Sequence, residues 1–556
     1  MNDLKMKVQN NLDFLVFCLA ILFCYFNIGN VVTDEYGFIA YRIASKHFSD
    51  HAVVDYYFLG FVGIGSLLRL LCEYADGINW MGLFEISVAL ITCYLYLKIV
   101  KEICVRYFNN NWFALLVLLF SSLVFIDIFL VVSHTKSSLL LCGLSLYILS
   151  FESISIRKRF LYNLSFVFGM LIRPESGVGM LIFVSAAFLI YKWDIRSLLN
   201  NFRYVYLFAI SVILTIALVW SASDDFLIEI EPEIEYKFLQ GYVKDIDSQK
   251  NFKDSVKYMA AVNGIIFDPD VLTPQYLRSI QEMPSTGESV LKVKNGINAV
   301  ANLYHYYNYI VFTMLLFLFL SLVKRKYALF FRLLAIDGFL FLLMFGLSIN
   351  SGLSNRHIQP FFLMLLLINL TYFFRWTGKL QFSSPKYWSL MIIFGIMLLN
   401  NTTEKYKINN DVLAKLAIDA ENRFRKMDEH FKNRIIVGTL SSQNELFNQR
   451  FSILNQRVFN NKYILFDCYN FSMLGQYRAY LDRLTNGNAY PPDKFFTWLS
   501  DHNALYLVSD EMGEVTQLYI NTIYDMSVSL DNDAFQVNLG DEDRIYTRIK
   551  KVTLRH

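Results

Sequence analysis

The sequence predicts a polytopic α-helical membrane protein with about eleven spans, an N-terminus inside, and a soluble C-terminal α/β domain on the outer face. Three observations predict this: the composition, a series of long apolar runs, and the placement of basic residues between them. Of the residues, 55% are apolar and 18% charged, and the mean hydropathy is +0.36. Soluble domains average about 45–50% apolar and 25% charged residues. The composition therefore excludes a soluble enzyme.

The longer apolar runs, of roughly 15 to 22 residues, have the length that crosses about 30 Å of hydrocarbon as a helix. Lys5 and Lys7 precede the first run, and no small-residue cleavage site follows it, so we expect an uncleaved first span. The predicted spans are 12–29, 81–99, 112–131, 137–150, 160–172, 177–191, 204–222, 308–323, 327–348, 357–374 and 387–400.

Basic residues set the predicted orientation. With the N-terminus inside, every connection from an even to an odd span carries lysine and arginine, as the positive-inside rule requires. The apolar segment 56–72 would invert this arrangement if it spanned, and it contains Arg69, so we expect an interfacial or re-entrant element there. The five basic connections are 98–106, 157–159, 192–203, 324–326 and 375–386.

Two domains follow from this topology. A transmembrane domain covers 1–400 and carries two large outer loops, 30–80 and 223–307. The polar tail, 401–556, alternates short apolar runs with helix-like segments, which is typical of an α/β domain. The apolar runs of the tail are 434–440, 463–468 and 504–509.

Several classes of function lack support in the sequence. The net charge is only +3 and the basic residues are scattered over short loops, which argues against a nucleic-acid partner. The seven cysteines show no CxxC or Cys/His spacing, so neither a disulfide framework nor a zinc site is indicated. GxSxG, HExxH, P-loop and GxGxxG motifs do not occur in a usable context.

The first candidate for chemistry is the pair Asp34–Glu35, directly after the first span. Two adjacent carboxylates at a membrane boundary raise one another's pKa, which suits a general base. The alternative is a solvated loop helix that Thr33 or Asp34 caps.

Two arginines mark further candidates at the outer ends of spans. Arg173 and Glu175 stand in an Arg-Pro-Glu turn, where a guanidinium offers a fixed fork for phosphate or carboxylate. An internal ion pair of these two residues is the alternative. Arg356 and His357 open the span 357–374, and snorkelling to the interface would also explain them.

The turn before 137–150 holds Asp127, His134 and Lys136. A lysine at the start of an apolar run gains nothing from packing, so an anionic partner is a reasonable expectation. The tyrosine-rich segment 303–309 is expected to form an aromatic belt at the interface, and a surface for stacking a sugar ring is the alternative.

The order of these features resembles the integral-membrane glycosyltransferases of the GT-C superfamily, which include protein O-mannosyltransferases and the aminoarabinose transferase that modifies lipid A. The shared order is a first span followed by Asp-Glu, an interfacial stretch, an Arg-Pro-Glu hairpin, and Arg-His-x-x-Pro opening a late span before an outer domain. The resemblance covers about 10–400 and leaves 401–556 unmatched.

The resemblance implies transfer of a sugar from a polyprenyl-phosphate donor to a glycan, lipid or protein acceptor on the periplasmic face. Asp34 would be the general base with Glu35 as its neighbour, while Arg173, Arg356 and Lys136 would hold the departing lipid phosphate. One base and a cation clamp suffice for direct displacement, so we expect inversion at the anomeric carbon.

Accessory roles are expected for Asp127, His134, Glu175 and His357. No cofactor is required by this scheme. A divalent cation remains compatible with it, because Asp34 and Asp127, together with the neighbouring Glu35, could supply oxygen ligands.

The abundance of Asn, Lys, Ile, Phe and Tyr is typical of AT-rich bacterial coding, which favours an inner-membrane protein of surface-polysaccharide or lipopolysaccharide assembly. Three alternatives stay open. A polysaccharide polymerase or O-antigen ligase would use Arg356, His357 and the loop 223–307. A transporter or flippase would usually carry ionisable residues in mid-span and paired halves. A non-catalytic anchor for the tail is the third.

Overall fold

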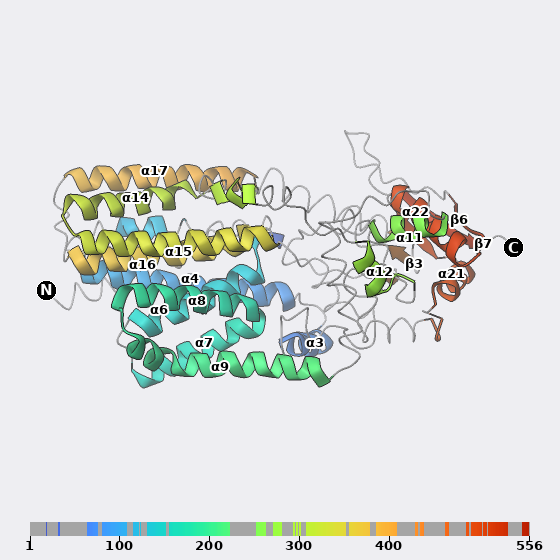
Figure 1. The fold of residues 1–556 in the computed structure, drawn as a ribbon, viewed down its shortest axis with the longest axis horizontal. Coiled ribbons are helices and arrows are strands. Elements are labelled where there is room, and N and C mark those ends of the chain that lie inside the picture. The colour runs from blue at the N-terminus through green and yellow to red at the C-terminus, as the bar shows by residue number, and fades with distance from the viewer. Residues whose placement is uncertain are drawn as a thin grey trace.

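The computed structural model shows a long bundle of helices with a smaller group of strands and helices beyond one end of it (Figure 1). The described residues are 18, 32–33, 64–75, 80–107, 115–121, 123, 131–151, 155–222, 252–262, 271–280, 293–294, 296–298, 300–301, 307–351, 355–377, 385–408, 429–431, 434–438, 462–465, 485–488, 491–502, 504–508, 510–531 and 548–554.

Most of the predicted spans coincide with helices of the bundle. Of those at 12–29 and 112–131, only residue 18 and residues 115–121, 123 and 131 are described. The helices of the bundle are α4 (Trp80–Tyr107), α6 (His134–Phe151), α7 (Ile156–Ile172), α8 (Pro174–Lys192), α9 (Ile195–Ala222), α14 (Asn308–Val323), α15 (Tyr327–Ser351), α16 (Asn355–Thr377) and α17 (Pro385–Ile408).

Within the described part of the chain, five helices are long and apolar enough to cross a membrane, and α14 is a shorter apolar helix. These helices confirm the coarse prediction of an α-helical membrane protein. The five segments are Gly82–Tyr107, Pro174–Lys192, Ile195–Leu214, Tyr327–Gly346 and His357–Trp376.

Helices α6 and α16 form the centre of the bundle, and their side chains are buried along most of their length. Helix α6 packs against α4, α7, α8 and α16. Polar side chains join the helices, as is usual where lipid supplies no hydrophobic drive for association. The Tyr147 hydroxyl of α6 hydrogen-bonds Thr371 of α16, and Asn369 Nδ2 of α16 donates to Asp337 Oδ1 of α15 at 2.8 Å.

Glycine permits the closest helix contact in this core. A Cβ atom on Gly169 of α7 would lie 2.6 Å from Cys142 Sγ and 3.3 Å from the Ser138 carbonyl oxygen of α6. Ser138 Oγ donates a hydrogen bond to the Gly169 carbonyl oxygen at 2.7 Å. Helices α6 and α7 therefore approach backbone to backbone at this point.

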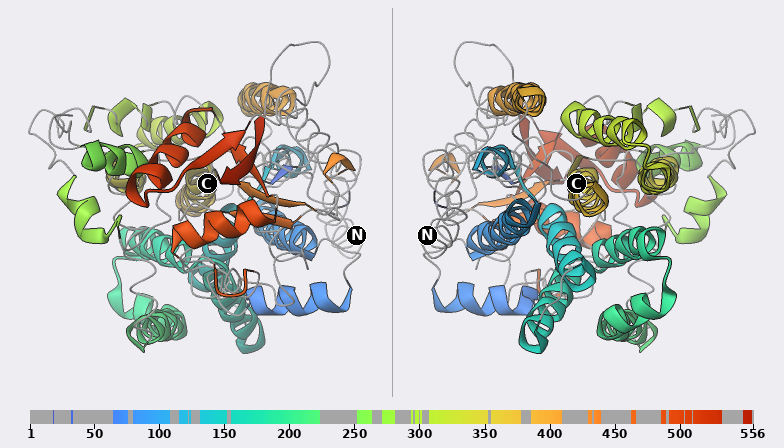
Figure 2. Two further views of the ribbon diagram at one scale, coloured as in Figure 1. Left: turned by 90° about the vertical axis from the view of Figure 1, so that its right-hand side faces the viewer. Right: turned by 90° about the vertical axis from the view of Figure 1, so that its left-hand side faces the viewer.

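The segment expected to be interfacial contains helix α3 (Ile64–Tyr74). Its 11 residues extend about 16 Å, which is too short to cross the hydrocarbon. Figures 1 and 2 show α3 running across the direction of the bundle helices, at the end of the bundle nearer to the strands. This length and orientation suit an interfacial helix; residues 56–63 lie outside the described residues.

The tail contains a five-stranded sheet with the order β4-β3-β5-β7-β6. Strands β3, β4 and β5 pair in parallel, and β7 pairs antiparallel with β5 and β6. Three strands coincide with the apolar runs noted in the sequence: β3 (Ile435–Gly438), β4 (Lys462–Leu465) and β5 (Leu505–Val508). The remaining elements are β6 (Val528–Asp531), β7 (Arg548–Leu554), α21 (Pro492–Asp501) and α22 (Asp510–Ile523).

Described helices from the segment 223–307 lie beside the tail in this group of strands and helices (Figure 2). Helix α11 (Phe252–Val262) of the loop packs against α22 of the tail. Val256 and Ala260 of α11 and Tyr519 of α22 are fully buried. Helix α11 and the tail are therefore parts of one packed unit, a contact that no pattern in the sequence predicts.

Candidate functional site

The site forms where helix α6 begins, and a short pair of strands leads into it. Strand β1 (Val32–Thr33) pairs in parallel with β2 (Val131–Val132), so that Thr33 lies beside Val132. Asp34 follows Thr33 in the sequence, and Ser133 and His134 follow Val132. The chain that leads to the Asp34–Glu35 pair therefore runs beside the chain that leads to α6.

Arg173 occupies the junction between α7 and α8, and the following residue explains its backbone. A residue before proline is disfavoured in the helical region, and Arg173 is extended with φ −155° and ψ 98°. Pro174 then opens α8 at a position where its missing N–H costs nothing. The Arg-Pro sequence thus separates the two helices and leaves Arg173 at the turn.

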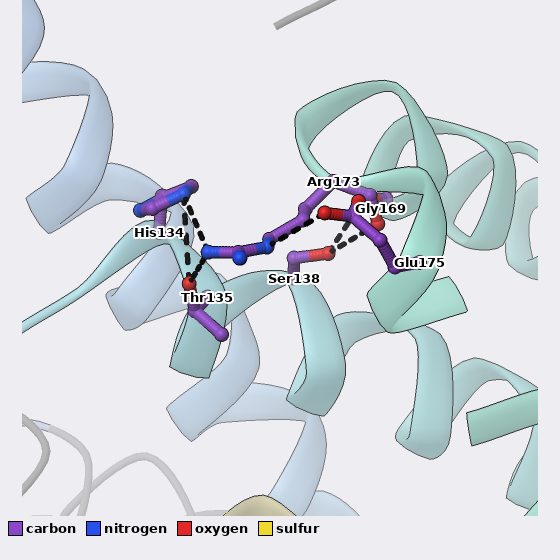
Figure 3. A network of polar contacts seen from close by, with 6 residues as sticks. All are labelled: His134, Thr135, Ser138, Gly169, Arg173 and Glu175. Atoms are coloured by element: carbon purple, nitrogen blue, oxygen red, sulfur yellow. Dashed lines mark hydrogen bonds and ion pairs between the residues drawn. The ribbon is translucent and has the colours of Figure 1, made fainter. Parts of the chain in front are cut away.

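The guanidinium of Arg173 reaches across to the first turn of α6 (Figure 3). Its Nη1 donates to Thr135 Oγ1 at 2.5 Å and lies 3.3 Å from His134 Nε2. Thr135 and His134 are both buried. Two polar groups of α6 therefore fix the direction in which one edge of the guanidinium points.

Ser138 ties the same turn to α6 from the backbone side. Its hydroxyl donates to the carbonyl oxygen of Gly169 at 2.7 Å and lies 3.5 Å from the carbonyl oxygen of Arg173. Figure 3 shows these contacts beside the Arg173 side chain. The position of the turn and the direction of its arginine are thus both set by hydroxyl groups in the first two turns of α6.

Glu175 contacts the other edge of the guanidinium, with Arg173 Nε 3.3 Å from Glu175 Oε1. The predicted alternative, an ion pair within the Arg-Pro-Glu turn, is therefore present. Glu175 is 47% exposed and Arg173 24% exposed, and an exposed pair of this kind contributes only about 0–1 kcal/mol. The ion pair occupies Nε, whereas Nη1 is directed toward α6.

The electrostatic environment of His134 brings a third helix into the site. Burial, the charge of Arg173 and the nearby His357 of α16 lower the pKa of His134 well below its usual range. A neutral His134 accepts at Nε2 from Arg173, which places its proton on Nδ1. Lys136 lies in the same first turn of α6 and is 4% exposed.

The structure therefore brings five of the predicted site residues to one end of the bundle, at the ends of α6, α8 and α16. The predictions for Asp34, Glu35 and Asp127 lie outside the described residues. The backbone of Arg356 belongs to the first turn of α16, and its side chain also lies outside the description. The five residues brought together are His134, Lys136, Arg173, Glu175 and His357.

The aromatic belt predicted for 303–309 is wrong for its two described tyrosines. Tyr307 and Tyr309 are 0% and 2% exposed, and the Tyr307 ring lies 5.2 Å from the ring of Phe362 in α16. Their hydrophobic rings fill space between α14 and α16 instead of facing the interface. Residues 302–306 lie outside the described part of the chain.

Thr135 and Ser138 were not singled out from the sequence, although they hold Arg173 and its turn. The available signal was a run of polar residues, His134 to Ser138, at the start of a strongly apolar helix. Hydroxyl groups can satisfy their hydrogen bonds within their own helix. The sequence alone therefore does not indicate that these two point toward a second helix, which depends on how α6 and α7 pack.

Among the described residues, no group of three or more His, Cys, Asp or Glu side chains is arranged to hold a metal ion. The expected oxygen ligands, Asp34, Glu35 and Asp127, lie outside the described residues. Comparison of the chain with protein-family models, curated proteins and solved structures found no match.

Proposed function

We propose that this protein is a membrane glycosyltransferase of the GT-C type that transfers a sugar from a polyprenyl-phosphate donor. The observation that carries the proposal is the partly buried hydrogen bonding of Arg173 to the first turn of α6. A guanidinium held in one orientation is suited to the phosphate of a lipid-linked sugar, because planar arginine binds two phosphate oxygens at once.

Two cationic side chains and a helix N-terminus lie close together where the phosphate would bind. Arg173 points at the first turn of α6, Lys136 belongs to that turn, and the helix itself presents its N-terminus there. A helix N-terminus favours anions through its free N–H groups and dipole. Cations fixed in advance in a site of low dielectric stabilise the charge that develops on a leaving phosphate.

Asp34 is the proposed general base, with Glu35 as its neighbour. The pairing of Thr33 with Val132 supports this role, because it brings the chain before Asp34 next to the chain before His134. In the proposed step Asp34 takes the proton of the acceptor hydroxyl, and the acceptor oxygen bonds the anomeric carbon. The bond from that carbon to the phosphate oxygen breaks, polyprenyl phosphate leaves, and the configuration inverts.

The proposed setting is a bacterial inner membrane, with the N-terminus inside, eleven spans, and the tail facing the periplasm. The ends of α8 and α16 that carry Lys192 and Arg375 lie opposite the site, in agreement with a basic inner side. The unit built from α11 and the tail would then stand on the acceptor side. The acceptor itself would be a glycan, a lipid or a protein.

The proposal is tested by measuring release of polyprenyl phosphate. The purified protein, Asp34→Asn and the matched control Asp194→Asn are incubated with a panel of polyprenyl-phosphate sugars and a glycan and lipid extract. Asp194 is an exposed carboxylate at the opposite end of α8. We expect release by the wild type and the control and its loss in Asp34→Asn.

Other outcomes separate the alternatives. Release by all three proteins would keep the lipid-sugar chemistry and move the base to Glu35 or Asp127. Product formed only from long lipid-linked glycans would indicate a polymerase or ligase instead. No release from any donor would favour the transporter or flippase.

A further inference from the structure

A second group of cations lies at the opposite end of the bundle. Helix α8 begins directly after Arg173 and ends with Lys192, and its 19 residues separate the two ends by about 28 Å. The first part of α15 and the last part of α16 reach the same end, where they carry Arg332 and Arg375. We call Lys192, Arg332 and Arg375 the distal cluster.

Direct contacts hold the distal cluster together around Tyr191. Arg332 Nη1 donates to the Tyr191 carbonyl oxygen at 2.9 Å, and the guanidinium of Arg375 lies 5.6 Å from the centre of the Tyr191 ring. The ammonium of Lys192 is close enough to Arg375 for the two like charges to repel each other. One residue of α8 therefore gathers arginines from two other helices.

Aromatic rings support the cations of this cluster. The Arg332 guanidinium lies 4.9 Å from the centre of the Trp376 ring, and Lys192 Nζ lies 4.7 Å from that of Phe188. Cation–π contacts orient a charged head without neutralising it. The arginine and lysine heads are thus placed by rings and a carbonyl group, none of which carries a negative charge.

Acidic neighbours do not balance this charge. Within the described residues, neither Arg332 nor Arg375 forms an ion pair with a carboxylate. Asp194 interacts with Lys192, and one of its oxygens accepts the Ser197 backbone N–H at 3.1 Å. Three cations with one nearby acid leave an excess of positive charge where the helices leave the apolar layer.

The positive-inside rule requires only that basic residues lie at this end, and it does not require them to converge. The start of α7 is an example of basic residues that do not converge. Arg157 and Lys158, which are exposed, and Arg159, which is half-buried, lie in the first turn of α7 at the same end of the bundle. The distal cluster differs because its charges come from three helices and converge on one tyrosine. Convergence of like charges is unfavourable unless an anion is shared among them.

We propose that the distal cluster binds the phosphate group of an anionic phospholipid headgroup from the leaflet at that end of the bundle. Arg332 and Arg375 would contact the phosphate oxygens, and Lys192 would add charge from the exposed side. Basic groups between spans are suited to anionic headgroups, and Trp376 is a residue type common at the membrane interface. The proposal is independent of the glycosyltransferase assignment, because it concerns other residues at the other end of the bundle.

Native mass spectrometry of the full-length protein tests this proposal. The protein is exchanged into mixed micelles of phosphatidylglycerol and phosphatidylcholine, and the bound lipid of each kind is counted. We expect wild-type protein to retain phosphatidylglycerol preferentially, and the double variant Arg332→Gln/Arg375→Gln to lose on the order of tenfold in this preference. The matched control Arg157→Gln/Arg159→Gln removes the same charge from the same end and should retain the preference.

A milder variant keeps the test informative if the double variant does not fold. Lys192→Gln removes an exposed charge without breaking the Arg332 hydrogen bond, and we expect a drop in the preference of about fivefold. Equal preferences in the wild type, the control and both cluster variants would overturn the proposal. Inorganic phosphate that displaces the lipid at low millimolar concentration would overturn it too, because the site would then recognise free phosphate.

Discussion

The two ends of helix α8 use basic residues in opposite ways. At its beginning, Arg173 is held by Thr135 and by a buried neutral histidine, and Glu175 contacts its second edge. At its end, the distal cluster rests on aromatic rings and one carbonyl group, and its lysine is exposed.

A reaction site and a binding surface at a membrane boundary differ in how firmly they orient their cations. Hydrogen bonds from two side chains fix the direction of a guanidinium, which is the preorganisation that transition-state stabilisation requires. Cation–π contacts hold a cation without a second side-chain hydrogen bond, and its positive charge suffices to attract an anion. The comparison predicts large effects on turnover at the Arg173 end and small ones at the distal end.

The largest effect is expected from Arg173→Gln, because the uncharged amide cannot stabilise a leaving phosphate. Polyprenyl-phosphate release should fall by about 100- to 1,000-fold, the usual loss when one such donor is removed. Arg173→Lys restores the charge without the planar fork and should recover only part of the rate. Equal rates of polyprenyl-phosphate release by Arg173→Gln and the wild type would show that Arg173 does not stabilise the leaving phosphate.

The next effect concerns the packing that positions the turn. Gly169→Ala places a Cβ atom against Cys142 Sγ and the α6 backbone, and overpacking of this kind costs about 1–3 kcal/mol. We expect a lower midpoint of thermal unfolding together with slower turnover.

Gly346→Ala in α15 is the matched control for this substitution, because nothing lies within 4 Å of the added atom. Its unfolding midpoint should match or exceed that of the wild type. A fall of the same size in both variants would show that α6 and α7 are not in close contact.

A smaller effect is expected from Thr135→Val, which preserves the shape of the side chain and removes the acceptor of the Arg173 hydrogen bond. Turnover should fall about 10- to 100-fold, because hydrogen bonds to charged groups contribute about 1.5–3 kcal/mol. Thr135→Ser keeps the hydroxyl and should retain most of the rate. A loss in Thr135→Ser as large as that in Thr135→Val would mean that the hydroxyl is not what positions Arg173.

The smallest effect on turnover is expected at the distal end. Arg332→Gln/Arg375→Gln should change the initial rate of polyprenyl-phosphate release by less than about twofold in detergent, because these residues lie about 28 Å from the Arg173 end. Initial-rate measurements at saturating donor check this expectation. A loss as large as that of Arg173→Gln would indicate that the reaction takes place at the distal end of α8 and not at the Arg173 end.

Local chemistry explains which parts could be predicted from the sequence. Apolar runs predicted the helices of the bundle, and Arg173-Pro174 predicted the turn, because a residue before proline leaves the helical conformation. The convergence of His134, Arg173 and His357 followed from expecting each of them at an outer end of a span.

Contacts between distant segments could not be predicted in this way. Strands β1 and β2 have two residues each, too few for a periodic pattern, and their pairing depends on the bundle that holds both. Tyr307 is buried because α16 covers it, which no feature of its own segment indicates. The Asp337–Asn369 hydrogen bond was missed for the same reason, since each residue alone is a single polar group in an apolar run.

Photoaffinity labelling with a diazirine-bearing polyprenyl phosphate tests the central claim most directly. The label is bound to the purified protein, activated, and mapped by mass spectrometry. We expect modified peptides from 131–138 and from the turn at Arg173, with labelling abolished in Arg173→Gln and by excess unlabelled polyprenyl phosphate. Competable labelling confined to other parts of the chain, with these two segments unmodified, would contradict it.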